Sequence, residues 1–283
     1  MVDDLTVRMK ESREFLAKGK HQEALARLMH LTEKYPDNRE VKSAIAAALN
    51  LRGIAQAEAG AMERAGIDFE RSLRYQETAD AHVSMGRLHQ SRGQFQEAFQ
   101  EYTRALDLDE DLAAAHEYLG YYFLEVGDPD QAVTAFGRAI AKGLASKHIY
   151  LGLWEAYMGL ERKEQAHEAA LEISKRLPDD DQVLGTLGLS YAVCQGDYDS
   201  AEDAWKRAVE INPKNLSSLF NLAGLAAVRS RRREAMDYLK RCVAIDRSRT
   251  LAMWKEDVNA TRQKFAAYSG DEDFLDILGV TAK

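Results

Sequence analysis

The feature that most constrains the fold is a pattern that recurs about every 34 residues. Its phase is marked by seven alanines that follow Gly- or Asp-containing turns: Ala24, Ala65, Ala98, Ala132, Ala166, Ala201 and Ala235. Successive steps between them are 41, 33, 34, 34, 35 and 34 residues. A unit of this length cannot bury its apolar face alone and must stack on its neighbours. The spacing therefore predicts an elongated, all-helical repeat domain.

Two further positions recur in phase with these alanines. Four residues later stands a bulky side chain in six of the seven repeats: Leu28, Phe69, Tyr102, Phe136, Trp205 and Leu239. Twelve residues earlier there is often a small one: Ser12, Gly53, Gly86, Gly120 and Ala223. Residues four positions apart lie on one face of a helix. The pattern therefore predicts two helices in each repeat, which pack closely at the small residue. Trp154 takes the small position in the fifth repeat, which predicts shifted packing there.

The pattern resembles the tetratricopeptide repeat (TPR) family over nearly the whole chain. The fourth repeat carries the resemblance most plainly, in Leu119, Gly120, Phe123, Gly127, Ala132, Phe136 and Ala139. The resemblance implies an all-α, right-handed superhelical solenoid of about seven helix-turn-helix repeats, with the first helix of each repeat on the concave side. It does not select a function, because such a fold serves many roles.

The departures from the repeat predict the ends and one unusual helix. The 41-residue step carries seven extra residues, or two helical turns, which predicts one long helix over 38–58. Leu251, Trp254, Val258, Phe265 and Tyr268 predict a capping helix over 250–268, so that the solenoid covers 1–268. Residues 269–283 form an acidic and apolar tail, which we expect to be flexible. The alternative is that its apolar residues plug the groove or contact a second copy.

The net charge indicates which partners to expect, and the cysteine count indicates the compartment. The chain has 46 acidic and 38 basic residues, a formal net charge of −8. An acidic surface repels phosphates and anionic lipid heads, so nucleic acid is an unlikely partner and no membrane partner is expected. Two cysteines, Cys194 and Cys242, cannot staple a chain of this size and favour a reducing compartment. With no apolar leader at the N-terminus, we expect a cytoplasmic protein.

The sequence carries no pattern that predicts catalysis, a cofactor or a metal site. It has no Gly-rich phosphate loop, nucleophile elbow, HExxH or CxxC motif. His82 and His116 recur at matching positions, but ordinary packing is the better interpretation. Arg231, Arg232 and Arg233, together with Arg229, could support a nucleic-acid-associated adaptor, although one cluster offers few phosphate contacts. We therefore expect no enzyme.

The resemblance implies that side chains one stripe away from the packing residues line a concave groove. This gives a candidate partner-binding set: Glu117, Tyr121, Leu124, Glu125, Leu151, Glu155, Met158, Leu189, Val193, Phe220 and Asn221. The set is apolar with an acidic fringe, so the expected partner is a peptide or helix with apolar anchors and basic residues. The Lys/Asn/Arg carboxylate clamp known in the family is largely missing, with Asn221 its one clamp-like residue.

Two alternatives to groove binding stay open. The same residues could simply pack between neighbouring first helices or against the tail. The chain could also be a structural protein that self-assembles through its groove or tail, as a homo-oligomer. The favoured interpretation is an adaptor or scaffold whose preorganised groove binds a protein partner.

Overall fold

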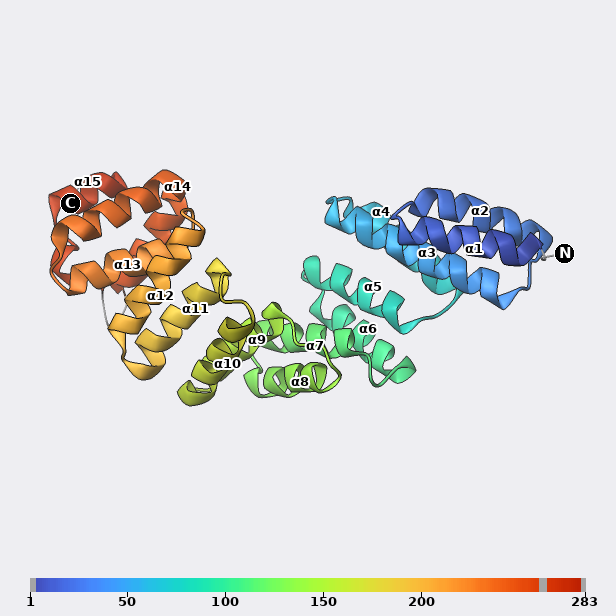
Figure 1. Ribbon diagram of the computed structural model, residues 1–283, viewed down its shortest axis with the longest axis horizontal. Coiled ribbons are helices and arrows are strands. Elements are labelled where there is room, and N and C mark those ends of the chain that lie inside the picture. The colour runs from blue at the N-terminus through green and yellow to red at the C-terminus, as the bar shows by residue number, and fades with distance from the viewer. Residues whose placement is uncertain (1–3, 260–263, 281–283) are drawn as a thin grey trace. The chain divides into compact units, whose positions relative to one another are not determined.

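The computed structural model describes residues 4–259 and 264–280, and within these ranges the chain is helical without strands. It divides into two compact units, Met1–Ala145 and Ser146–Lys283, which are described separately. The helices of the first unit, in blue to green in Figure 1, are α1 (Asp4–Ala17), α2 (His21–Lys34), α3 (Arg39–Glu58), α4 (Met62–Tyr75), α5 (Ala79–Ser91), α6 (Phe95–Leu108), α7 (Ala113–Glu125) and α8 (Pro129–Ala141).

The second unit continues the same alternation. Its helices are α9 (Lys147–Gly159), α10 (Lys163–Arg176), α11 (Asp181–Ser190), α12 (Tyr198–Ile211), α13 (Leu216–Val228), α14 (Arg232–Asn259) and α15 (Glu272–Leu278). A π-helical turn, Tyr191–Gln195, follows α11, and a short 3₁₀ turn, Ala266–Tyr268, precedes α15. Odd-numbered and even-numbered helices pair from α1/α2 to α13/α14, as predicted for seven repeats.

Local sequence signals set where the helices begin. Most first helices start at a capping side chain, as when Asn38 Oδ1 accepts a hydrogen bond from the Val41 amide (3.1 Å) at the start of α3. Several second helices follow a glycine with positive φ, such as Gly60 (79°) before α4 and Gly93 (72°) before α6. A residue with a Cβ is strained in that conformation, so glycine recurs at these turns.

In four repeats the small position is a glycine that accommodates an aromatic ring. A Cβ added to Gly120 would lie 2.5 Å from the Phe136 ring, and one added to Gly188 would lie 2.4 Å from the indole nitrogen of Trp205. The aromatic ring of the second helix thus packs directly against the backbone of the first helix at the glycine. In the fifth repeat the sizes are exchanged: Trp154 on α9 packs against the cluster that contains Ala170 of α10. This exchange is how the predicted departure is accommodated.

The predicted long helix over 38–58 is α3, which has 20 residues where α5, α7, α9 and α13 have 13 each. The predicted capping helix over 250–268 is wrong in its limits. Helix α14 kinks at Asp246 (φ −154°, ψ 98°), and its second part ends at Asn259. Asp246 causes the new start, since its Oδ1 accepts from the Arg249 amide (2.9 Å) as a cap.

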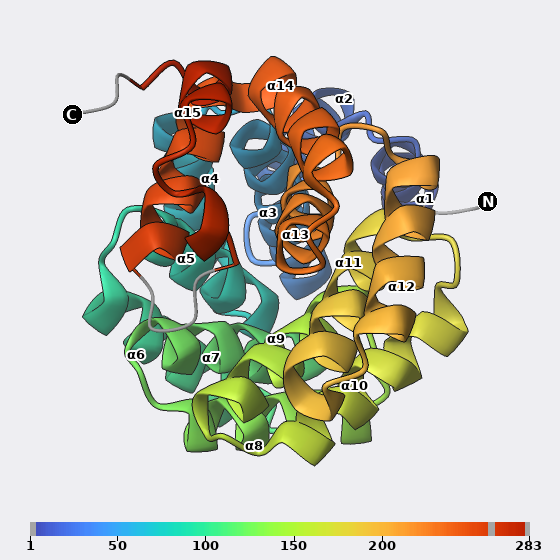
Figure 2. The same cartoon turned by 90° about the vertical axis from the view of Figure 1, so that its left-hand side faces the viewer.

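The expectation of a flexible tail is also wrong for the described residues. Figure 2 shows α15 beside α14, and both Phe274 and Leu278 are fully buried. Phe274 stacks on Tyr268 at 4.6 Å between ring centroids. The acidic residues of the tail have local partners: Arg232 pairs with Asp271 at 2.9 Å and with Asp273 at 2.6 Å.

Candidate functional site

In the first unit, the predicted binding residues of α7 form a half-buried stripe that combines an aromatic ring, an aliphatic side chain and glutamates. Tyr121 rests edge-on against Phe136, 5.1 Å between ring centroids, and its hydroxyl donates to Glu117 Oε1 at 3.4 Å. Burial raises the pKa of the Tyr121 phenol, so this group stays protonated as a donor. Leu124 is half-buried, whereas Glu125 is exposed.

The α7 stripe is tied to the preceding repeat by hydrogen bonds. Gln90 of α5 donates through Nε2 to Glu125 Oε2 (3.2 Å), and its Oε1 accepts from the Tyr102 hydroxyl (2.8 Å). Because Tyr102 is itself fully buried, the carboxylate of Glu125 is linked to the core of the unit through two bonds. This arrangement orders an exposed acidic group before any partner arrives, which lowers the entropic cost of binding.

In the second unit, α9 and α11 carry the next predicted residues. Leu151 and Met158 of α9 are half-buried and Glu155 is exposed. The Cys194 thiol donates to Met158 Sδ at 3.6 Å, so the π-helical turn lies against this part of α9. Leu189 is half-buried and Val193 in the turn is 47% exposed. The structure therefore brings Met158 to the segment that carries Val193.

The last two predicted residues, Phe220 and Asn221 of α13, lie in the core. They are 3% and 7% exposed. Phe265 covers Phe220 at 5.4 Å between ring centroids, and Lys264 donates through Nζ to Asn221 Oδ1 at 2.9 Å. The chain's own C-terminal segment thus covers the inner stripe of α13. We do not retain these two residues in the proposed site.

Three of the four arginines in the basic cluster around the start of α14 form ion pairs. Arg229 pairs with Asp199 (2.6 Å), and both Arg229 and Arg231 pair with Glu202. Arg232 is held by the two aspartates before and at the start of α15. These contacts leave little positive charge for phosphates, which weakens the nucleic-acid alternative.

The candidate histidines are held by neighbouring groups. His82 lies between Glu101 (2.6 Å from Nδ1) and Glu77 (3.2 Å from Nε2), and His116 Nε2 is 3.1 Å from the Glu110 carbonyl oxygen. Over residues 4–259 and 264–280, no three His, Cys, Asp or Glu side chains are arranged to hold a metal ion. In the same ranges, no helix is both long and apolar enough to cross a bilayer.

Sequence reasoning missed a pocket in the first unit. It lies between α1, the first two turns of α3 and the end of α4, and it has a volume of about 710 Å³. The 41-residue step was the available signal, because the seven extra residues lengthen α3 by two turns. The helix was predicted, but the cavity beside it needs the positions of three helices.

Comparison with known families agrees with this architecture. A family model described as TPR repeat matches residues 86–127, and one described as tetratricopeptide repeat matches residues 119–181 and 186–249. Together these matches span more than half of the chain. The chain belongs to the tetratricopeptide repeat family. This TPR protein has no match among curated protein sequences.

Solved structures resemble this TPR protein in fold at low sequence identity. PilF of Pseudomonas aeruginosa superposes with a TM-score of 0.66 at 17% identity, over 82% of this chain and 99% of that one. YrrB gives 0.53 at 20% identity, over 66% and 97%. Yeast Tom70 gives 0.58 at 15% identity, over 89% and 58%. Identities this low support the fold alone.

Proposed function

We propose that this TPR protein is an adaptor that binds a peptide or partner helix on the first helices of its repeats. The observation that carries the proposal is the α7 stripe, where Tyr121 and Leu124 stay half-buried beside Glu117 and Glu125 while the packing face of the helix is closed. On α9, Leu151, Glu155 and Met158 supply a second stripe of the same chemistry. YrrB, which shares the fold, is described as having an unusual peptide-binding site, and this supports the proposal by analogy.

Binding would follow from preorganisation. The stripe side chains project from rigid helices, so little conformational entropy is lost when a partner docks. Apolar anchors of the partner would cover Tyr121 and Leu124, and its Lys or Arg side chains would pair with Glu117 and Glu125. The proposal gives the protein no catalytic role. Its two free cysteines favour a reducing compartment such as the cytoplasm.

The test is a selection of random peptides on the intact protein, followed by affinity measurements with variants. We expect Leu124→Asp and Glu125→Lys each to weaken the selected peptides about tenfold or more, which corresponds to about 1.4 kcal/mol. Ile67→Asp is the matched control, since Ile67 lies on second helix α4 and is 57% exposed. Circular dichroism verifies that the variants fold. Selected peptides that bind all three variants as tightly as the parent would contradict this site.

Light scattering distinguishes the structural alternative from the adaptor. A molar mass that rises with concentration, and returns to the monomer value in Leu124→Asp, would assign the α7 stripe to self-assembly. A concentration-independent monomer that binds peptide supports the adaptor.

A further inference from the structure

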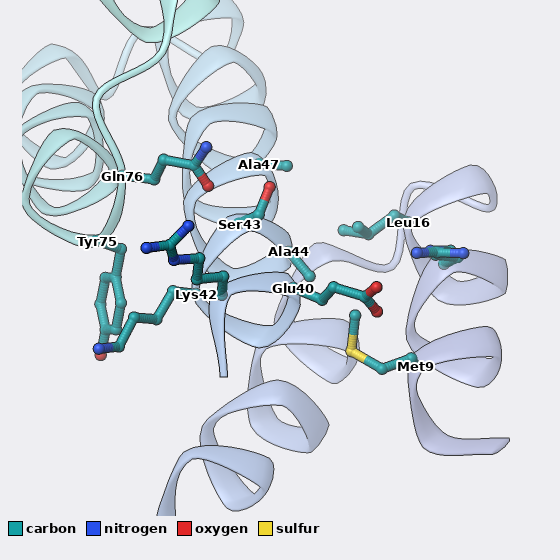
Figure 3. Close-up of a pocket in the computed structure, with 11 residues that line it drawn as sticks. Met9, Leu16, Glu40, Lys42, Ser43, Ala44, Ala47, Tyr75 and Gln76 are labelled. Atoms are coloured by element: carbon teal, nitrogen blue, oxygen red, sulfur yellow. The ribbon is translucent and has the colours of Figure 1, made fainter. Parts of the chain in front are cut away.

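The pocket beside α3 is created by the two extra turns of that helix. Glu40, Ser43, Ala44 and Ala47 line it, and their spacing of three and four residues places them on one face of α3. In Figure 3, Met9 and Leu16 of α1 project toward Glu40 and Ala44, while Tyr75 and Lys42 lie on the other side of α3. A first helix of ordinary length would leave out most of this wall.

Part of the pocket lining is apolar. Met9 is buried at its base, and Leu16, Ala44 and Tyr75 are half-buried. A volume of about 710 Å³ is enough for one or two large side chains of a partner. Seven of the eleven lining residues carry polar or charged groups, but the side chains of Met9, Leu16 and Ala44 form an apolar wall that suits an apolar anchor.

The rim of the pocket is basic, in contrast to the chain as a whole. Arg13, Arg39 and Lys42 line it with a single acid, Glu40, although the chain has a net charge of −8. Arg13 and Arg39 are exposed and form no ion pair with any described residue. Lys42 pairs with Asp37 at 3.3 Å, but this aspartate is 98% exposed, so the pair is weak. Two guanidinium groups are therefore open to a ligand's carboxylates.

We propose that this pocket binds an acidic peptide segment, with an apolar side chain between α1 and α3 and neighbouring Asp or Glu carboxylates on Arg13 and Arg39. The guanidinium fork matches a carboxylate in two-point geometry. Charge complementarity excludes the basic partner proposed for the α7 stripe, so the two surfaces would hold different segments. The pocket proposal does not depend on the α7 proposal, because no lining residue is shared.

The geometry disfavours the competing phosphate ligand. Nucleic acid binding gains its affinity from many neutralised phosphates along a track. Here two arginines without ion pairs line a pocket with one apolar wall, and Glu40 lies between α1 and α3. A peptide that presents one or two carboxylates next to an apolar anchor satisfies this arrangement, whereas a continuous phosphate chain does not.

The experiment uses displayed random peptides selected on the intact chain, with the α7 variant Leu124→Asp as bait so that the first proposed site is removed. We expect the selected peptides to be rich in Asp and Glu next to Leu, Ile or Phe. The double variant Arg13→Glu/Arg39→Glu should weaken them at least about tenfold, and added salt should reduce their affinity. The matched control is Arg64→Glu/Arg71→Glu, which makes the same charge change on exposed positions of α4.

The proposal is overturned if the selected peptides lack acidic residues, or if both double variants bind them equally. It is also overturned if a single-stranded oligonucleotide binds more tightly than the peptides and depends on Arg13 and Arg39. Because the bait already lacks the α7 site, failure here leaves that proposal standing, and failure of the α7 test leaves this one standing. Thermal melts of both double variants verify that the first unit stays folded.

Discussion

Helices α3 and α13 are both first helices, and at matching repeat positions they carry different side chains: Asn50, Ile54 and Glu58 in α3, and Phe220, Gly224 and Val228 in α13. Their environments differ accordingly. Seven of the 20 residues of α3 are buried, against 11 of the 13 residues of α13. Beside Ile54 the structure keeps a cavity of about 170 Å³, whereas the stem of Lys264 fills the space over Gly224.

This difference shows that a repeat position alone does not define a binding surface. At α13, an apolar stripe is covered by an aromatic cluster from the same chain, in which the ring centroids of Phe265 and Trp254 lie 4.7 Å apart. Asp257 holds this cover in place, because its carboxylate accepts the amides of Lys264 (3.1 Å) and Phe265 (3.0 Å). At α3, Asn50 is buried, but Ile54 is half-buried and Glu58 is exposed, so the later part of the stripe stays open.

Removing the aromatic cover of α13 should have the largest effect. Phe265 is fully buried between Phe220 and Trp254, so Phe265→Ala should lower the free energy of unfolding by about 3–5 kcal/mol. Urea denaturation followed by tryptophan fluorescence measures the loss. The control is Phe95→Ala on α6, where the ring is 37% exposed and the expected change is at most about 0.5 kcal/mol. Equal losses in the two variants would mean that the C-terminal segment is not part of the core.

The repeats could be predicted from sequence because the residues that contact each other within a repeat are separated by a constant number of positions. Gly120 and Phe136 are 16 residues apart and touch, and the same pairing recurs at Gly86 and Tyr102. The open stripe of α7 was predicted for the same reason. Contacts with no periodic signal could not be predicted. An example is the contact of Phe265 with Phe220, which joins a residue after the last repeat to a residue of a repeat helix.

The C-terminal segment was also misjudged, because the positions of its charged residues matter more than their number. Residues 269–283 carry acidic side chains and were expected to be flexible. In the structure, Arg232 faces Asp271, and Arg247 donates from Nε and Nη2 to the carbonyls of Leu278 and Gly279, each at 3.2 Å. Two well-placed guanidinium groups outweigh the average charge, since such interactions act at short range. The net charge of the whole chain likewise gave no sign of the basic pocket at α3.

Replacing each of two buried asparagines, one in α3 and one in α13, should change the stability of the protein in opposite directions. Asn50 of α3 is 8% exposed, and its Oδ1 is buried with no hydrogen-bond partner among the described residues. Asn221 of α13 is similarly buried, but its Oδ1 accepts from Lys264. Asn50→Leu should therefore stabilise the protein by about 1 kcal/mol, whereas Asn221→Leu should cost about 1–2 kcal/mol. Shifts of the same sign in thermal denaturation would contradict this account.

Acid should loosen the cover of α13 and leave the start of α3 unchanged, with a smaller effect than either substitution above. Asp271 caps α15 by accepting the amides of Asp273 (3.1 Å) and Phe274 (3.4 Å). The hydrogen bond from Arg232 lowers the pKa of Asp271 below the ordinary value of an aspartate. Since the folded-state pKa is the lower one, the stabilisation is present above about pH 4 and is lost as the pH falls through the folded value. Helix α3 begins at Asn38, which does not titrate.

Hydrogen exchange of the amides in α15, measured from pH 5 down to pH 3 and corrected for the intrinsic rate, tests this difference. Protection in α15 should fall below about pH 4, whereas that in the first turn of α3 should not. Asp271→Asn keeps an acceptor for the cap but cannot titrate, so it should have weaker protection at neutral pH and lose the acid dependence. If that variant keeps the acid transition, another group controls the docking of α15. Because Asp271 is only partly buried, the transition should also shrink with added salt, which would separate it from the salt-insensitive packing of Phe274 on Tyr268.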